Sequence, residues 1–293
     1  MITLTYLPKQ TNKTIAASLT ILCNGILITA KLMVAIYSSS VSILSEAIHS
    51  GIDLLAALIT FFAVRLSDHP ANDSYPFGYG KIENISALLE GVLLFTASFI
   101  IIKEAILKII FPAETAETSL AIIVMAVSAV LNALLSSYLY KVAKKEDSAA
   151  LAADASHLKA DVYTSCGVGI GILLMKLTGL PIIDPIVAII VALLITKEAW
   201  HLSKNALMPL LDAGLPLKDR LRIKEVLEKF QGNIIDYHDV RTRKAGNSTF
   251  IDLHVTMDKN LTVKESHDLG EFIESELESA IRNATISIHV DPS

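Results

Sequence analysis

The stretch from Ser42 to Phe62, SILSEAIHSGIDLLAALITFF, decides the fold. Its composition predicts a helix inside a lipid bilayer, yet it contains an imidazole, His49, and a carboxylate, Asp53. Residues four apart lie on one face of an α-helix, so these two side chains point the same way. An ionisable side chain at mid-membrane costs at least about 2.5 kcal/mol on insertion scales, so a functional role is the default interpretation.

The same spacing recurs in ADASHLKADVYTS, residues 153–165, where His157 and Asp161 are again four apart. Two matching pairs on two helices offer two imidazole nitrogens and two carboxylates to one point. A tetrahedral Zn2+ ion accepts such a donor set. The alternative is a helix-packing role, in which each histidine hydrogen-bonds an aspartate across the helix interface.

The whole chain has the composition of a membrane protein. It has 293 residues, 52% of them hydrophobic, and a mean hydropathy of +0.52. A bilayer core requires about 20 apolar residues per helix. The net charge of −5 lacks the basic surplus of a nucleic-acid-binding protein, so we expect no nucleic-acid partner. We predict six transmembrane helices, at residues 15–36, 41–64, 85–110, 120–139, 160–177 and 182–202.

The distribution of basic residues predicts the orientation of these spans. With six spans, one side holds most of the lysine and arginine residues, and the positive-inside rule assigns that side to the cytoplasm. Both termini are then cytoplasmic, in a multi-pass protein of a bacterial or archaeal cell membrane. The basic residues on that side are Lys9, Lys13, Arg65, Lys81, Lys141, Lys144, Lys145, Lys197 and Lys204, against Lys108 and Lys176 on the other.

The composition changes at about Asp212, which divides the chain into a transmembrane domain, residues 1–211, and a polar domain, residues 212–293. The polar part shows a helical pattern at 217–230, alternation at 250–257, a second amphipathic helix at 265–281 and alternation at 286–291. The order helix, strand, strand, helix, strand predicts an α+β domain. In its first helix the candidate buried residues are Leu221, Val226, Leu227 and Phe230.

Several potential metal ligands occur in this short domain. In the last strand, His289 and Asp291 share a face, and His254 lies on the polar face of its own strand. Four histidines and one aspartate at strand and helix ends favour a metal cluster over dispersed, solvent-exposed side chains, although spacing alone leaves both open. The other two histidines are His238 and His267.

The chain resembles the cation diffusion facilitator family of proton-coupled divalent-metal exporters. The similar segments include SEAIHSGIDLLAAL, FGYGKIENISALLEG, ADASHLKADVYTS, IDPIVAIIVALLI and, near the C-terminus, HDVRTRKAG and IHVDPS. The resemblance implies a homodimer of six-helix protomers in lipid, each with a cytoplasmic ferredoxin-like domain. It also implies a transport site made of His49, Asp53, His157 and Asp161, and a non-enzymatic function.

The resemblance carries further expectations for the metal sites. Zinc is the leading substrate, while cobalt, iron and manganese remain alternatives, because selectivity depends on geometry as well as ligand type. Relatives with an extra loop site have histidines where this chain has Tyr75 and Tyr79, so we expect no such site. In the polar domain we expect a bridging carboxylate between two ions. One would be bound by His238, His254 and Asp291, and the other by His267, His289 and Asp291.

Other charged residues also have two possible roles each. In relatives, the positions of Lys81 and Asp212 pair where the membrane and cytoplasmic parts meet; the alternative is two unrelated surface charges. Asp184, at the start of the sixth span, is expected to be a helix N-cap and not a ligand.

Two other classes of function compete with transport. A membrane-anchored metal sensor or assembly protein would bind the ion without moving it. An intramembrane metallohydrolase is disfavoured, because the sequence has no His-Glu-x2-His motif and four protein ligands leave no open position for water.

Overall fold

The computed structural model describes residues 11–38, 41–111, 119–180 and 182–293. These residues divide into two compact units. The first contains the chain up to Pro70 together with Ile82–Leu207, and the second contains Ala71–Lys81 together with Met208–Ser293.

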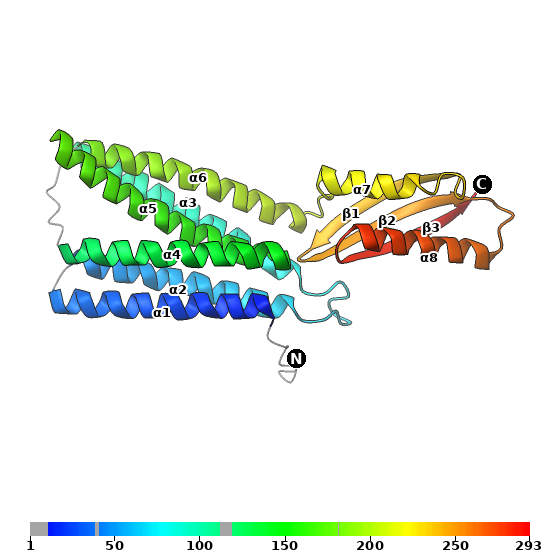
Figure 1. Ribbon diagram of the computed structural model, residues 1–293, viewed down its shortest axis with the longest axis horizontal. Helices are drawn as coiled ribbons and strands as arrows, with labels where there is room; N and C mark the ends of the chain where they lie inside the picture. The colour runs from blue at the N-terminus through cyan, green and yellow to red at the C-terminus, as the bar shows by residue number, and fades with distance from the viewer. Residues whose placement is uncertain (1–10, 39–40, 112–118, 181) are drawn as a thin grey trace. The chain divides into compact units, whose positions relative to one another are not determined.

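The first unit is a bundle of long helices in which consecutive helices run in opposite directions, and α3, α5 and α6 are inclined to α1, α2 and α4 (Figure 1). Six helices occur where six were predicted, although three have clearly different bounds. The fourth continues past residue 139, the fifth starts well before residue 160, and the sixth continues past residue 202. Their bounds are α1 Asn12–Ser38, α2 Val41–Ser67, α3 Lys81–Ile110, α4 Ser119–Glu146, α5 Ala149–Thr178 and α6 Ile183–Leu210.

The early start of α5 follows from where its polar residues lie. Asp154 and Ser156 are each only 3% exposed, so they face neighbouring helices and not lipid. A span predicted from hydropathy excludes such polar residues, although the interior of a helix bundle can bury them. By length and hydropathy, five of the described helices could cross a membrane, namely α1, α2, α3, α4 and α6.

Alanines and larger apolar side chains pack the first unit near the start of α5. A buried cluster joins α1, α2, α4 and α5, and half of its residues are Ala, which lets helix backbones approach closely. Large apolar side chains such as Leu22, Leu55 and Phe62 are instead exposed, as expected for a surface that faces lipid. The cluster consists of Ala16, Ala17, Val64, Leu135, Leu139, Ala143, Ala150, Leu151, Ala155 and Leu158.

The second unit contains a three-stranded sheet and two helices. The sheet order is β1-β2-β3, with β1 and β2 antiparallel and β2 and β3 parallel. The predicted α+β order is confirmed. The elements are α7 Leu217–Glu228, β1 Asp236–Ala245, β2 Ser248–Met257, α8 Val263–Ala280 and β3 Ala284–Pro292.

One face of this sheet carries both helices. Ile251, Leu253, Val255 and Met257 of β2 are at most 1% exposed and share one hydrophobic core with residues of α7 and α8. Because side chains alternate along a strand, the other residues of β2, including His254, lie on the face without helices.

The predicted core of α7 needs one correction. Val226, Leu227 and Phe230 are buried as expected, but Leu221 is 49% exposed, and Ile223 is buried instead at 2% exposure. Positions 223, 226, 227 and 230 follow the i, i+3, i+4, i+7 pattern of one helix face, and position 221 lies off that stripe.

The loop before α3 packs on the sheet of the second unit. The Phe77 and Phe250 rings meet edge to face at 5.3 Å, and the Arg243 guanidinium lies 4.3 Å and 4.5 Å from their centroids. The expected pairing of Lys81 with Asp212 is present, with Nζ 2.7 Å from Oδ1. This hydrogen bond, together with the charges of Lys81 and Arg243, lowers the pKa of Asp212.

Candidate metal-binding sites

The first candidate site lies inside the helix bundle, between α2 and α5. Asp53, His157 and Asp161 each offer a ligand atom, and these atoms lie within 4.8 Å of one another. His157 Nε2 is 3.2 Å from Asp53 Oδ1, and both residues are less than a tenth exposed. The structure thus brings three of the four expected ligands together. The fourth, His49, belongs to α2, but its side chain lies outside the described part of the chain.

A cavity of about 410 Å³ reaches this group. Its lining runs along α1 from Asn24 to Lys31 and along α5 from His157 to Val168. The cavity therefore extends from the three ligands toward the end of the bundle where α1, α3 and α5 finish.

The opposite end of the bundle is closed by a buried ion cluster. Lys13 Nζ lies 2.6 Å from Asp68 Oδ1 and 2.9 Å from Glu83 Oε1. Ser67 and Ser148 donate hydrogen bonds to the two oxygens of Glu83. The lysine and glutamate side chains are 5% and 3% exposed, so the cluster ties the ends of α1, α2, α3 and α5 together away from water.

Asparagine side chains from neighbouring helices contact two of the ligand residues, and a lysine contacts a serine in the same cavity. Asn132 Nδ2 on α4 donates to Asp161 Oδ2 at 3.4 Å, and Asn24 Nδ2 on α1 donates to the backbone carbonyl of Asp53 at 3.5 Å. Lys31 Nζ donates to the hydroxyl of Ser50 at 2.8 Å, within the lining of the same cavity.

Two buried carboxylates near the group were not singled out from the sequence. Glu90 on α3 is 1% exposed and Asp154 on α5 is 3% exposed. Thr60 donates to one oxygen of Glu90, while Glu90 Oε2 and Asp154 Oδ2 have no hydrogen-bond partner among the described residues. The sequence did contain a signal for Asp154. It precedes His157 by three residues, and an acidic residue inside an apolar span is rare.

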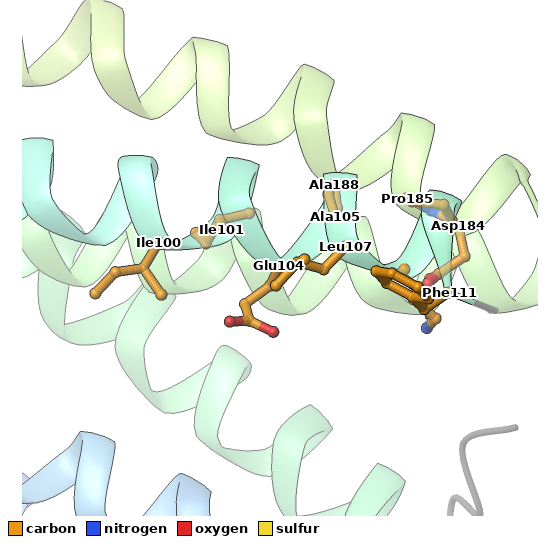
Figure 2. A pocket seen from close by; sticks show the side chains of 10 residues that line it. Ile100, Ile101, Glu104, Ala105, Leu107, Phe111, Asp184, Pro185 and Ala188 are labelled. Carbon is orange, nitrogen blue, oxygen red and sulfur yellow. Dashed lines mark hydrogen bonds and ion pairs between the residues drawn. The ribbon is translucent and has the colours of Figure 1, made fainter. Parts of the chain in front are cut away.

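A separate cavity of about 550 Å³ lies against α3 and α6 and contains none of the expected ligands (Figure 2). At its edge Lys108 Nζ donates to Asp184 Oδ2 at 2.7 Å. Because α6 begins at Ile183, Asp184 is already helical, so the N-cap expectation is wrong. The acid instead forms an ion pair with Lys108 that joins the end of α3 to the start of α6.

The second candidate site lies on the helix-free face of the sheet. His238 of β1 is in register with His254 of β2, and His254 with His289 of β3. The first two rings are 5.3 Å apart and the second two 4.7 Å, so the three imidazoles form a row across the sheet. The row results from period-two alternation acting on three adjacent strands.

Asp291 contacts all three histidines of this row. Its Oδ2 atom lies 3.0 Å from His254 Nδ1 and 3.4 Å from His238 Nε2, while its Oδ1 atom lies 3.5 Å from His289 Nε2. His238, His254 and Asp291 form a group whose ligand atoms lie within 4.8 Å of one another. One carboxylate therefore has an oxygen toward each of the two expected ion positions.

His267 lies apart from this group in the described chain. It belongs to α8, on the other side of the sheet, and its Nε2 atom is 3.4 Å from Glu271 Oε1 one turn along the helix. Its role as a ligand of the second ion stays a prediction.

Two family models of known proteins match the chain, one after the other. A family model described as the cation efflux transmembrane domain matches residues 17–211. A second, described as the cation efflux protein, cytoplasmic domain, matches residues 215–293.

Similar proteins extend over most of the chain. The cation-efflux pump FieF of Shewanella oneidensis is 30% identical over 91% of this chain and 89% of its own length. The uncharacterized transporter MJ0449 of Methanocaldococcus jannaschii is 31% identical over 93% of this chain and 96% of its own. The metal-bound C-terminal domain of the CzcD transporter from Thermotoga maritima is 32% identical, covering 26% of this chain and 88% of that chain, with a TM-score of 0.25. With both family models matched in order, the chain belongs to the cation efflux, or cation diffusion facilitator, family and is a multi-pass membrane protein that exports divalent cations.

Proposed function

We propose that this protein is a secondary transporter that moves Zn2+ out of the cytoplasm in exchange for protons. The transport site consists of His49, Asp53, His157 and Asp161. The observation that carries the proposal is the convergence of three of these side chains, from two helices, at the end of a cavity inside the bundle.

The donor set supports zinc as the substrate. Two imidazole nitrogens and two carboxylate oxygens match the tetrahedral preference of Zn2+, whereas Mn2+ prefers six oxygen ligands. Cobalt and iron are the remaining alternatives, because imidazole also binds them.

Proton exchange follows from the chemistry of the ligands. Metal binding requires a neutral imidazole and ionised carboxylates, so the arrival of the ion releases any protons these groups hold. Protons that return from the other side compete for the same atoms and release the ion. Histidine suits this exchange because its unperturbed pKa of about 6.5 lies near the pH of both compartments.

The described conformation corresponds to one access state. The cavity reaches the site from one end of the bundle, and the Lys13 cluster closes the other end. In the proposed orientation, both termini are cytoplasmic and α1 to α6 all cross the membrane. The closed end is then cytoplasmic, and the cavity faces outward. Transport requires the bundle to alternate between this state and one that opens inward.

The cytoplasmic domain is proposed to form the homodimer and to bind two regulatory ions. Asp291 bridges them, with His238 and His254 on one side and His267 and His289 on the other. The open sheet face and the row of three histidines support this assignment. Metal bound here biases the conformational equilibrium if it binds the two access states unequally.

The experiment is zinc flux into proteoliposomes with an imposed proton gradient. Wild type should accumulate zinc while protons leave the lumen in exchange. His157→Ala and Asp53→Ala should each abolish flux, since each removes one of four ligands. His201→Ala is the matched control, because this histidine is exposed on α6 and should leave flux unchanged. Near-normal flux in both site variants would reject the transport site.

The same assay separates a transporter from a membrane-anchored sensor. A sensor would bind zinc in the full-length protein and show no flux under any proton gradient. Flux of cobalt, iron or manganese that exceeds zinc flux would retain the mechanism and change the substrate.

A further inference from the structure

Asn132, on α4, contacts Asp161, an expected ligand of the membrane site. It is 9% exposed, lines the same cavity, and donates from Nδ2 to Asp161 Oδ2 at 3.4 Å. Its amide oxygen is buried and has no hydrogen-bond partner among the described residues. The donor faces the carboxylate, as electrostatics requires, since the amide oxygen would be repelled by it.

Packing alone does not account for an asparagine at this position. A buried amide with an unpaired oxygen destabilises the protein, and an apolar side chain of the same shape would avoid that cost. The contact with Asp161 is therefore the feature that an asparagine supplies and a leucine does not.

The position of Asn132 relative to Asp161 is fixed by the packing of α4 on α5. Ser136 Oγ, one turn further along α4, donates to the backbone carbonyl of Ala155 at 2.7 Å. Leu135 and Leu139 belong to the buried cluster that also contains Leu151 of α5. The amide therefore reaches the carboxylate from a helix that is packed directly on α5.

We propose that Asn132 is a positioning residue that sets the metal selectivity of the transport site. By donating to Oδ2 of Asp161, it holds the carboxylate in one orientation relative to the other ligands. A carboxylate held so that it supplies a single oxygen favours the four-coordinate sites of zinc and disfavours ions that take six oxygens, such as Mn2+. This inference rests on the proposed function and names a determinant of its selectivity.

The test compares zinc and manganese flux in proteoliposomes containing the full-length protein. Asn132→Leu removes the donor and keeps the volume, Asn132→Ala removes it without filling the space, and Asn132→Asp replaces it with an acceptor. Loss of a partner that orients a metal ligand typically lowers metal affinity about 10-fold or more. We expect Asn132→Leu to raise the zinc KM about 10-fold with little change in kcat.

The ratio of kcat/KM for zinc to that for manganese should fall in all three variants, and furthest in Asn132→Asp, which adds a hard oxygen. Ser128→Ala is the matched control. Ser128 lies one turn before Asn132 on the same face of α4, lines the same cavity, and has no hydrogen-bond partner among the described residues. Its ratio should equal that of wild type. The thermal midpoint of Asn132→Leu should equal or exceed that of wild type, which a purely structural role would not allow.

An unchanged ratio in Asn132→Leu and Asn132→Ala overturns the inference, as does an equal shift in Ser128→Ala. The failure of the proposed function is distinguishable in the same assay. If His157→Ala retains flux, the transport site itself is wrong. If His157→Ala loses flux and the Asn132 variants behave as wild type, only the selectivity role is wrong.

Discussion

The proposed bridging role of Asp291 rests on how its two carboxylate oxygens lie among the histidines. Its Oδ2 faces His254 and His238 while its Oδ1 faces His289, so the carboxylate stands between two sets of nitrogen atoms. The sequence predicted that His289 and Asp291 share a strand face, because the alternation of side chains can be inferred from a single strand. The registration of three histidines in one row depends on how β1, β2 and β3 pair, and no local pattern supplies that information.

Asp291→Ala should weaken both cytoplasmic ions at once. The domain Asp212–Ser293, which has its own hydrophobic core, can be titrated with zinc by calorimetry. Wild type should bind two ions per protomer and the variant should lose both high-affinity events, while transport by the full chain falls but persists. Asp252→Ala is the control, since Asp252 is an exposed acid on the same strand as His254. Loss of one binding event alone would show that Asp291 does not bridge.

Residues inside the bundle also show the limit of sequence reasoning. The repeated His-x3-Asp spacing identified both helices of the proposed transport site, because ionisable residues in an apolar span are costly and a functional role is their default interpretation. Glu90, Asp154 and Asn132 were not identified as neighbours of that site. Each is a polar residue without a repeated partner pattern, and only the packing of α3, α4 and α5 determines what it faces.

Helix α8 illustrates how an element is defined by its first turn. Thr262 accepts a hydrogen bond from the Glu265 backbone N–H, and Glu265 accepts one from the Thr262 backbone N–H, which forms a capping box. The Thr262 hydroxyl and the Thr262 backbone N–H both donate to the Glu265 carboxylate, and these two hydrogen bonds lower the pKa of Glu265. The sequence predicted this helix from its amphipathic pattern, whereas the bounds of α5 were misjudged because its buried polar residues resemble the end of a span.

Thr262→Ala should destabilise the cytoplasmic domain by about 1 kcal/mol at neutral pH, the usual cost of losing such a cap. A carboxyl with a lowered pKa stabilises the folded state above its unfolded pKa, and that contribution disappears as pH falls through the folded value. The difference between wild type and variant should therefore shrink in acid. Urea unfolding of the domain at pH 7 and in acid measures both. Lys264→Ala, an exposed change in the same turn, should show no such dependence.

At the scale of the whole molecule, the membrane unit has one packed half and one hollow half. The packed half contains the alanine-rich cluster and the ion cluster of Lys13, Asp68 and Glu83, and the hollow half contains the cavity. Removing one partner of a buried ion pair costs about 3–5 kcal/mol, because the remaining charge is left buried without a counter-charge. An alternating-access cycle must separate these groups each time the site opens to the cytoplasm.

Glu83→Gln should shift the bundle toward the state that opens at the cytoplasmic end. The change keeps the shape of the side chain, and its amide can accept from one of the two serines, Ser67 or Ser148, and donate to the other. It removes a charge that faces Lys13. The two natural cysteines are first replaced by alanine, and Ser165→Cys then places one thiol in the cavity lining. A membrane-impermeant thiol reagent should label the background protein mainly from outside. In Glu83→Gln, labelling from outside should slow several-fold and labelling from the cytoplasmic side should rise.

Asp184→Asn is the control, because it breaks the ion pair at the opposite end of the bundle and should not increase cytoplasmic labelling. Equal labelling profiles in the Glu83→Gln and background proteins would show that the cluster stabilises the fold without controlling access.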